Sequence, residues 1–235
     1  MSETEEASRQ IESMTAELEK LKRRQSRNQR AALAKGLLQG ICSMLKPGDI
    51  VFDCGANVGD VTVPLAATGA EVHAFEPDPF AFSLLTKATK NLPNVTLHNV
   101  AVGVQPGSVK LMRANNFSDN PLGASVKSTV ISGGRKINEE VNEDSTIDVE
   151  LISLPDFVSE FFNKRGELAF IKMDIEGAEL DILEVMQEQD IFDKVRLTVA
   201  ETHENKFKAL RPRFKTLRDK VTKKHPITKV NLDWI

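Results

Sequence analysis

The chain contains few of the residues that mark secreted, membrane-spanning or base-stacking proteins. Its 235 residues include two cysteines, one tryptophan and no tyrosine. Two thiols do not make a disulfide framework, so we expect a reduced, cytoplasmic protein in which Cys42 and Cys54 are buried packing residues. No apolar run approaches the roughly 18 residues of a membrane helix. The acidic start of the chain lacks an apolar core, so no signal peptide is expected.

The overall composition of the chain is typical of a folded globular protein. Hydrophobic residues make up 40% of the chain and charged residues 28%, and the formal net charge is −3. Short apolar runs alternate with amphipathic stretches after residue 48, which predicts an α/β fold with a mostly parallel sheet covered by helices on both faces. The predicted strands are 49–53, 71–75, 95–98, 168–173 and 195–200, and the predicted helices lie near 58–68, 79–91, 154–164, 177–188 and 203–223.

The first 30 residues predict an amino-terminal helix that precedes the main domain. Ile11, Met14, Leu18 and Leu21 follow the spacing of a coiled-coil seam, but the next two seam positions are polar. Two apolar heptads are too few to hold a partner firmly, so a homo-oligomer and packing on the chain's own domain both remain open. We assign 1–30 to this helix, with a short coiled coil as one possibility, and 31–235 to the main domain, which begins with a second helix up to residue 45.

The most informative stretch is Asp49–Asp60, which contains the sequence Phe-Asp-Cys-Gly-Ala-Asn-Val-Gly. An apolar strand runs into a turn at Gly55 and Gly59, where glycine permits a sharp turn and the close approach of a ligand. The next strand ends at Glu76. In a βαβ unit a carboxylate at this position meets the hydroxyls of an adenosine ribose. The pattern therefore predicts an adenosine-containing cofactor.

Two features of the glycine turn favour S-adenosylmethionine over NAD. A nicotinamide-binding loop reads Gly-x-Gly-x-x-Gly, and its middle glycine is absent here. Asp53 precedes the turn, and its carboxylate would repel a pyrophosphate but attract the ammonium and sulfonium groups of S-adenosylmethionine. Alternatively, Asp53 caps the turn through its own side chain. That alternative does not explain Glu76.

Four segments resemble the FkbM family of S-adenosylmethionine-dependent methyltransferases. They are Phe52–Gly59, Phe75–Pro77, Asn99–Gly103 and, most specifically, Ile171–Glu179. The similarity covers roughly residues 48–201. It implies a class I methyltransferase fold, which is Rossmann-like and has a seven-stranded, mostly parallel sheet with an antiparallel last strand. It also implies O-methylation of an acceptor hydroxyl on a glycan, a glycolipid or another small molecule such as a natural product.

The resemblance further implies which residues hold the cofactor. The turn from Asp53 to Gly59 would hold the methionine part, Glu76 the ribose, and the turn from Asn99 to Ala101 would lie by the adenine. The expected cofactor residues are Asp53, Gly55, Ala56, Asn57, Gly59, Glu76, Pro77, Asn99, Ala101 and Asp174.

An O-methyltransferase needs a base or a metal, because an alcohol has a pKa far above 7. The ends of the fourth and fifth predicted strands face the ligand and supply Asp174, Glu176, Glu201 and His203. His203 is the first candidate for general base, and Asp174 or Glu176 would hold the acceptor hydroxyl or orient the histidine. Asp174, Glu201 and His203 could also bind one divalent cation that prefers oxygen ligands, although their spacing does not require it.

Each of these residues also has a structural explanation. Asp174 and Glu176 suit a helix start, where carboxylates satisfy free amides, and His203 suits the beginning of the next helix. Glu179 is interpreted as a first-turn residue. Between the third and fourth strands, a hairpin arm near 109–112 is followed by an irregular insert over 113–134, which we interpret as a substrate-covering loop. A second strand pair around 147–154 would close the insert.

Two other functions stay open. The segment 206–229 holds ten basic residues and one acid, which suits phosphates. Lys172, Asp174 and Glu201 would imitate the catalytic set of an RNA ribose 2′-O-methyltransferase. Nucleic acid is disfavoured by the negative net charge and the few aromatic residues, and the same patch suits an anionic glycan or glycolipid. The chain could also be a non-catalytic protein that binds a partner through its first helix and keeps a vestigial cofactor pocket.

Overall fold

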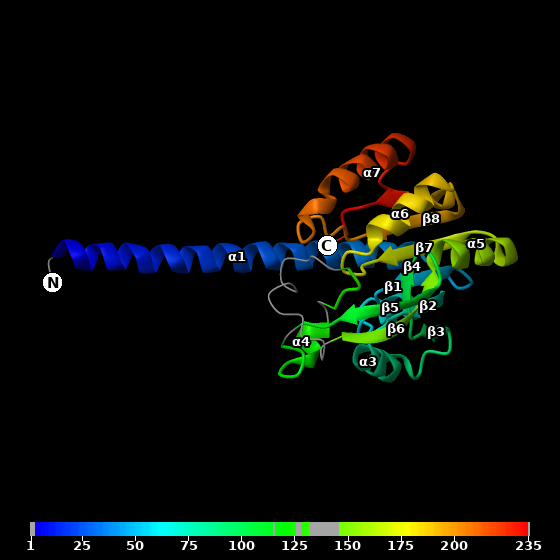
Figure 1. The fold of residues 1–235 in the computed structure, drawn as a ribbon, viewed down its shortest axis with the longest axis horizontal. Helices are drawn as coiled ribbons and strands as arrows, with labels where there is room; N and C mark the ends of the chain where they lie inside the picture. Colours follow the sequence, from blue (N-terminus) through cyan, green and yellow to red (C-terminus); the bar gives the residue numbers. More distant parts are fainter. Residues whose placement is uncertain (1–2, 115, 126–127, 132–145, 235) are drawn as a thin grey trace. The chain divides into compact units, whose positions relative to one another are not determined.

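The computed structural model describes residues 3–114, 116–125, 128–131 and 146–234 (Figure 1). The chain divides into an amino-terminal unit that ends at Ile41 and a main unit over Cys42–Trp234. Among the described residues, no helix combines the length and the apolar character needed to cross a membrane. Cys54 is buried as expected, whereas Cys42 is only partly buried, and both thiols are free.

The amino-terminal unit is a single helix. α1 (Glu3–Met44) continues without interruption where the sequence predicts two helices that meet at residue 30. Neither glycine nor proline occurs before Gly36, so nothing in the sequence ends a helix at that junction. The four apolar seam residues, Ile11, Met14, Leu18 and Leu21, are exposed.

A six-stranded sheet forms the centre of the main unit. From one edge to the other its strands are β3 (Val95–His98), β2 (Glu71–Phe75), β1 (Ile50–Cys54), β7 (Leu168–Met173), β8 (Val195–Ala200) and β9 (Val230–Asn231). All neighbouring strands are parallel. β1 and β7 are buried along their whole length, which explains their nearly continuous apolar runs.

The sheet differs from the expected one in its strand number and in its last strand. The described residues give it six strands instead of seven, and β9 is parallel to β8 instead of antiparallel. The reason is the connection between them. α7 (Arg211–Lys224) joins β8 to β9, and a strand that returns through a helical crossover runs parallel to its neighbour.

Helices cover both faces of the sheet. Side chains alternate along β2, so Phe75 packs against Phe157 of α5 (Leu154–Arg165), while Ala74 packs with Leu85 of α3 (Pro79–Thr89) on the opposite face. The remaining helical segments are α2 (Thr62–Ala67), α6 (Glu179–Glu188) and the 3₁₀ turns η2 (Ile191–Lys194) and η3 (Lys208–Leu210).

The segment between β3 and β7 forms a second, three-stranded sheet. Its order is β4 (Ala101–Gly103), β6 (Thr146–Ser153) and β5 (Gly107–Met112). The strand predicted near 109–112 is present as β5, which pairs antiparallel with β6. The second strand pair predicted around 147–154 is instead the single strand β6. The described part of the predicted substrate-covering loop contains α4 (Pro121–Ser125), and Thr129 forms a bridge with Met112. Residues 115, 126–127 and 132–134 of that loop lie outside the described residues.

The predicted helix at 203–223 begins later than expected. Residues 203–207 form a turn in which the amides of Lys206 and Phe207 donate to the carbonyl oxygen of His203, and α7 starts only at Arg211 with Pro212 in its first turn. His203 is therefore held in a tight turn after β8 and not in a helix.

Candidate active site

A cleft of about 270 Å³ opens where the carboxyl ends of β1, β2, β7 and β8 meet. This is the edge at which ligands bind in open parallel sheets, beside the point where the strand order reverses. The predicted site residues that line the cleft are Gly55, Asn57, Glu76, Pro77, Ala101, Asp174, Glu176 and Glu201. Asp53, Ala56, Gly59, Asn99 and His203 are not among the lining residues.

Gly55 allows the turn after β1 to pack directly on the turn after β7. Its φ is +79°, and a Cβ atom on it would lie 1.8 Å from the carbonyl oxygen of Asp174. The amides of Gly55 and Ala56 both donate to the carbonyl oxygen of Phe75 at 3.0 Å, which ties the turn to β2 as well. A side chain at position 55 would therefore separate the two halves of the site.

Glu76 is a buried carboxylate at the end of β2. Its Oε2 accepts a hydrogen bond from the amide of Asn57 and its Oε1 one from the amide of Asp78, both at 2.9 Å. Burial raises the pKa of Glu76 to about 7 against the effect of these hydrogen bonds. Each carboxylate oxygen keeps a second lone pair, so Glu76 can still accept hydrogen bonds from ligand hydroxyls.

Asp53 and Asn99 contact the segments that line the cleft but do not line it themselves. Asp53 is fully buried; its Oδ2 accepts from the hydroxyl of Thr62 at 2.6 Å, and its Oδ1 lies 3.4 Å from Nζ of Lys172. Asn99 donates to the carbonyl oxygens of Glu76 at 2.8 Å and Pro77 at 3.2 Å. Asp53 thus faces a buried lysine and does not line the cleft.

The turn after β7 is held in an uncommon backbone conformation. Glu176 has a φ of 58°, which is unusual for a residue with a side chain. Gly177 follows with a φ of +114°, and a Cβ atom there would lie 2.2 Å from Cε2 of Phe207. The hydroxyl of Thr129 fixes the turn by donating to the carbonyl oxygen of Glu176 at 2.6 Å. This conformation directs the Glu176 carboxylate into the cleft.

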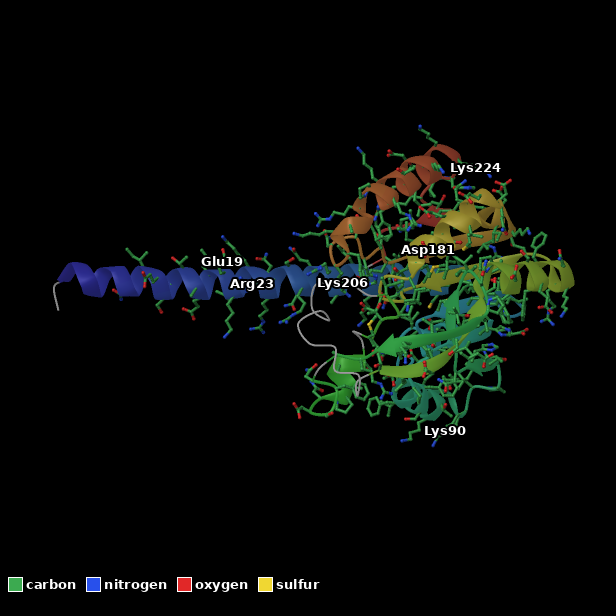
Figure 2. All side chains as sticks on the ribbon, viewed as in Figure 1. Glu19, Arg23, Lys90, Asp181, Lys206 and Lys224 are labelled. Atoms are coloured by element: carbon green, nitrogen blue, oxygen red, sulfur yellow. The ribbon has the colours of Figure 1, made fainter. Side chains whose placement is uncertain are left out.

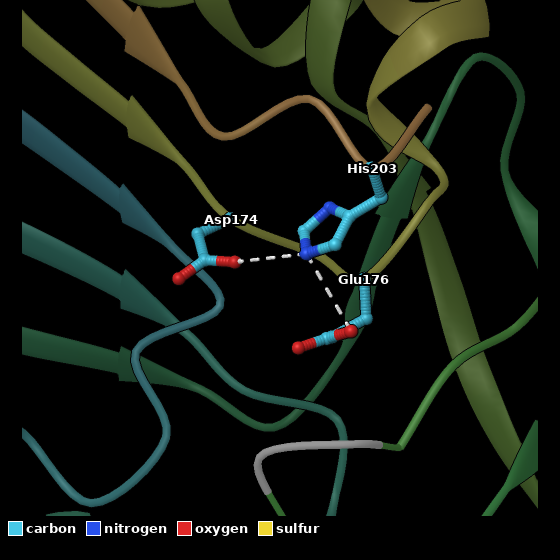
Figure 3. Close-up of side chains that lie close together, drawn as sticks. All are labelled: Asp174, Glu176 and His203. Atoms are coloured by element: carbon cyan, nitrogen blue, oxygen red, sulfur yellow. Dashed lines mark ion pairs between the residues drawn. The ribbon is translucent and has the colours of Figure 1, made fainter. Parts of the chain in front are cut away.

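The structure brings His203 together with all three predicted catalytic carboxylates. Its Nε2 lies 3.5 Å from Oε2 of Glu176 and 3.9 Å from Oδ1 of Asp174 (Figure 3). The same nitrogen lies 3.7 Å from Oε1 of Glu201. Its Nδ1 lies 3.0 Å from Oε1 of Glu179. Burial disfavours the charged ring, but the hydrogen bond and the negative charges of Glu179 and Glu176 raise the pKa of His203 to about 8.

Two carboxylates of this cluster are suited to proton transfer. Burial raises the pKa of Glu176 and Glu201, and the neighbouring Asp174 acts in the same direction on both. Lys206 forms an ion pair with Glu176 and partly opposes this effect. Because Glu176 and Glu201 line the cleft and His203 does not, the carboxylates have more direct access to a ligand than the histidine.

Sequence reasoning missed the roles of Glu179 and Asp78. Glu179 does start α6, but its carboxylate is fully buried and accepts from the amides of Ile175 and Gly177 as well as facing His203. Asp78 caps α3 and accepts two hydrogen bonds from Arg113, which ties the end of β5 to the end of β2. The Asp-Pro pair before α3 was the available signal for the cap.

The basic carboxyl-terminal segment is partly neutralised by acids of the same chain. Lys206 forms an ion pair with Glu176, and Lys224 forms ion pairs with Asp190 and Asp193. Arg213 pairs with Asp181 and Glu184, and Arg218 pairs with Asp233 and Glu204. Lys206, Lys224 and Asp181 are labelled in Figure 2. Lys172 is 3% exposed and does not line the cleft. Both findings weaken the comparison with an RNA ribose methyltransferase.

The fold and site define a doubly wound α/β protein with a ligand cleft at its switch point. The family described as "Methyltransferase FkbM domain" matches residues 53–225, which is more than half of the chain. The chain therefore belongs to the FkbM methyltransferase family, and the resemblance predicted from the sequence is confirmed.

Two known proteins illustrate this similarity. The chain is 29% identical to "31-O-demethyl-FK506 methyltransferase FkbM" of Streptomyces tacrolimicus, over 68% of this chain and 67% of that protein. It is 25% identical to "Hexuronic acid methyltransferase AglP" of Haloferax volcanii, over 66% of this chain and 56% of that protein. The chain thus spans 67% and 56% of the lengths of these two relatives. Among solved structures, a "SAM Dependent Methyltransferase" from Agrobacterium tumefaciens matches with a TM-score of 0.40 and 11% identity, over 82% of this chain and 50% of that chain.

Proposed function

We propose that the chain is an S-adenosylmethionine-dependent O-methyltransferase that methylates a hydroxyl on a sugar of a glycan or glycolipid, or on a natural product. One observation carries this proposal. Four carboxylates line the cleft (Glu76, Asp174, Glu176 and Glu201), and among the described residues no lysine or arginine does. Such a cleft attracts the sulfonium and ammonium groups of S-adenosylmethionine and repels a diphosphate. The same charge disfavours NAD and RNA as ligands.

The residues present fit this cofactor. Gly55 lines the cleft without a side chain, and its packing against the backbone of Asp174 holds the two turns of the site together. Glu76 offers carboxylate lone pairs for ribose hydroxyls, and Asn57 and Pro77 line the cleft beside it. Asp53 and Asn99 would act on the cofactor through the turns that they hold, without contacting it.

When bound, S-adenosylmethionine supplies a methyl group already activated on a sulfonium. The chain must then align the acceptor oxygen with that methyl carbon and remove the hydroxyl proton. We assign proton removal to Glu201 or Glu176, because both line the cleft and burial raises the pKa of both carboxylates. The carboxylate of Glu201 or Glu176 would accept the hydroxyl proton while the acceptor oxygen takes the methyl group. The names of the two relatives favour a hydroxyl-bearing small molecule or sugar acid over a nucleic acid as acceptor.

Calorimetric titration of the purified chain with S-adenosylmethionine and, separately, NAD tests the cofactor assignment. We expect binding of S-adenosylmethionine alone, and at least tenfold weaker binding by the Glu76→Ala variant. Glu71→Ala is the matched control, because Glu71 is the first residue of β2 and lies at the end of the strand opposite to Glu76. Binding of NAD in preference to S-adenosylmethionine would contradict the proposal, and so would unchanged affinity in Glu76→Ala.

The acceptor is tested by methyl transfer to extracted glycans, glycolipids and small molecules, with the product identified by mass. We expect a ribonuclease-treated lysate to retain its labelled acceptor. Loss of labelling after ribonuclease would favour the RNA alternative. Tight cofactor binding without transfer to any fraction would instead favour the non-catalytic alternative.

A further inference from the structure

The ring of His203 has one nitrogen with a partner and one without. The side chain is 2% exposed, and Nδ1 lies 3.0 Å from Oε1 of the fully buried Glu179. The Glu179 carboxylate also accepts hydrogen bonds from two backbone amides, so it acts as the acceptor toward the ring as well. Nδ1 of His203 is therefore the donor and carries a hydrogen. In the described part of the chain, Nε2 is buried and has no hydrogen-bond partner. A buried nitrogen without a partner is costly unless a ligand satisfies it.

The unpartnered nitrogen points into a ring of carboxylates, as the dashed lines of Figure 3 show for Asp174 and Glu176. Its distances to Asp174, Glu176 and Glu201, 3.5 to 3.9 Å, are too long for hydrogen bonds. The ligand atoms of Asp174, Glu176 and His203 all lie within 4.8 Å of one another. Atoms bound to one ion at about 2.0–2.2 Å lie about 3 to 4 Å apart, so only a small contraction is needed.

The charges around this nitrogen also favour a cation. Four carboxylates surround the imidazole, those of Asp174, Glu176, Glu179 and Glu201. Two lysines oppose them. Lys172 lies 3.7 Å from Asp174 but also 3.4 Å from Asp53, and Lys206, which is 47% exposed, pairs with Glu176. An exposed lysine can turn away into solvent, which would free the Glu176 carboxylate for an ion.

We propose that Asp174, Glu176 and His203 together bind one first-row divalent cation at the floor of the cleft. A set of one imidazole and two carboxylates suits Mn²⁺, Fe²⁺ or Zn²⁺ better than Ca²⁺, which prefers oxygen alone. Glu179 is the outer partner that orients the histidine, an arrangement common among metal-bound histidines. Three protein ligands leave open positions, as in catalytic sites.

The role of the cation rests on the proposed O-methyltransferase function, whereas its binding does not. Asp174 and Glu176 line the cleft, so open positions on the ion would face the acceptor hydroxyl. A bound cation would lower the pKa of the acceptor hydroxyl, and Glu201, which lies beside the ligands but is not one of them, would accept the proton. His203 in this arrangement is a ligand and does not act as a base.

The experiment uses the full chain after removal of metals with a chelator, and Mn²⁺ as the probe. Electron paramagnetic resonance of free Mn²⁺ should show one ion bound per chain. Electron spin-echo modulation should show coupling to an imidazole nitrogen, and this coupling should be absent in His203→Asn. Asp174→Asn should weaken binding at least tenfold, and Glu179→Gln by roughly 10- to 100-fold. Asp181→Asn, which removes an exposed acid from the first turn of α6, is the matched control.

Lys206→Ala provides an independent test, because it should raise the affinity for Mn²⁺, whereas the substitutions of Asp174 and Glu179 should lower it. Removing a positive charge that pairs with Glu176 should tighten Mn²⁺ binding several-fold. A purely structural ion-pair cluster would bind no ion in any variant. Absence of Mn²⁺ binding by the native chain, or nitrogen coupling that persists in His203→Asn, would overturn the metal site.

Failure of the metal site and failure of the proposed function can be distinguished. S-adenosylmethionine binding and methyl transfer that persist in excess chelator would remove the metal site and leave the function. Mn²⁺ binding without any affinity for S-adenosylmethionine would remove the proposed function and leave the metal site. Circular dichroism of each variant shows that lost binding does not reflect lost folding.

Discussion

The Nζ atom of Lys172 donates a hydrogen bond to the carbonyl oxygen of Gly55 at 2.7 Å. The same ammonium group lies 3.4 Å from Asp53 and 3.7 Å from Asp174, so one buried lysine joins β7, the end of β1 and the glycine turn. Burial disfavours its charge, but the two carboxylates raise the pKa of Lys172 overall. The turn that forms one wall of the cleft is therefore positioned by a charged group that does not line the cleft.

Replacing Lys172 should destabilise the chain strongly. Lys172→Met leaves the fully buried Asp53 without its cation, and breaking a buried ion pair typically costs about 3–5 kcal/mol. The free energy of unfolding from denaturant titration measures the effect. Lys220→Met, on the exposed face of α7, should change it by less than about 0.5 kcal/mol. The double variant Asp53→Asn with Lys172→Met should recover part of the loss; equal loss in single and double variants would contradict this explanation.

Adding one methyl group at Gly55 should damage both stability and cofactor binding. Gly55→Ala introduces a Cβ atom at 1.8 Å from the Asp174 carbonyl oxygen and at a φ of +79°. The strained backbone alone should cost about 1–3 kcal/mol, and relief of the clash must move the two turns apart. Gly107→Ala is the matched control, because no atom lies within 4 Å of its Cβ position. Normal S-adenosylmethionine affinity in Gly55→Ala would show that the contact between the turns is not needed for the site.

The stability of the unliganded chain should fall as pH rises through the titration of Glu76. Burial raises its pKa from 4.5 to about 7, so the folded chain binds this proton more tightly than the unfolded chain. The stability that the proton on Glu76 contributes is fully present below about pH 4.5 and is lost as pH rises through about 7. Relative to Glu76→Gln, wild-type unfolding free energy should therefore decrease over this window, by up to about 3 kcal/mol. Parallel pH profiles of the two proteins would contradict the raised pKa.

The long elements of the fold were predictable because their hydrophobic patterns are strong. The runs at β1 and β7 are apolar along their length, and both strands are buried in the middle of the sheet. β9 and β4, with two and three residues, carry too short a pattern to be recognised. The single helix α1 was divided because the change of composition near residue 30 was interpreted as a boundary, although helix formation depends on propensity and on the absence of breakers.

The sequence predicted which residues come together in the site, but not which of their side chains line the cleft and which are buried away from it. Carboxyl ends of parallel strands meet at one edge, and this rule brought Asp174, Glu201 and His203 together. Asp53 and Glu76 look alike in sequence, since each is an acid at the end of a strand. Their side chains point to different places, Asp53 to Lys172 behind the turn and Glu76 into the cleft. Sequence position alone does not contain that difference, because it depends on which partner packs beneath each strand end.

The exposed seam of α1 leads to a prediction about assembly. Ile11, Met14, Leu18 and Leu21 are 51% to 65% exposed, and they occupy the a and d positions of two heptads. In a parallel pair with a second copy, Glu17 at position g would face Lys22 at position e of the other helix, which favours that orientation.

Because two heptads give marginal stability, we expect weak, concentration-dependent dimers in sedimentation velocity. Leu18→Glu should abolish them by placing a charge in the seam. Ala16→Glu adds the same charge outside the seam and should leave the dimers intact. Two results would count against this role for the helix: a monomer at every concentration, or equal behaviour of the two variants.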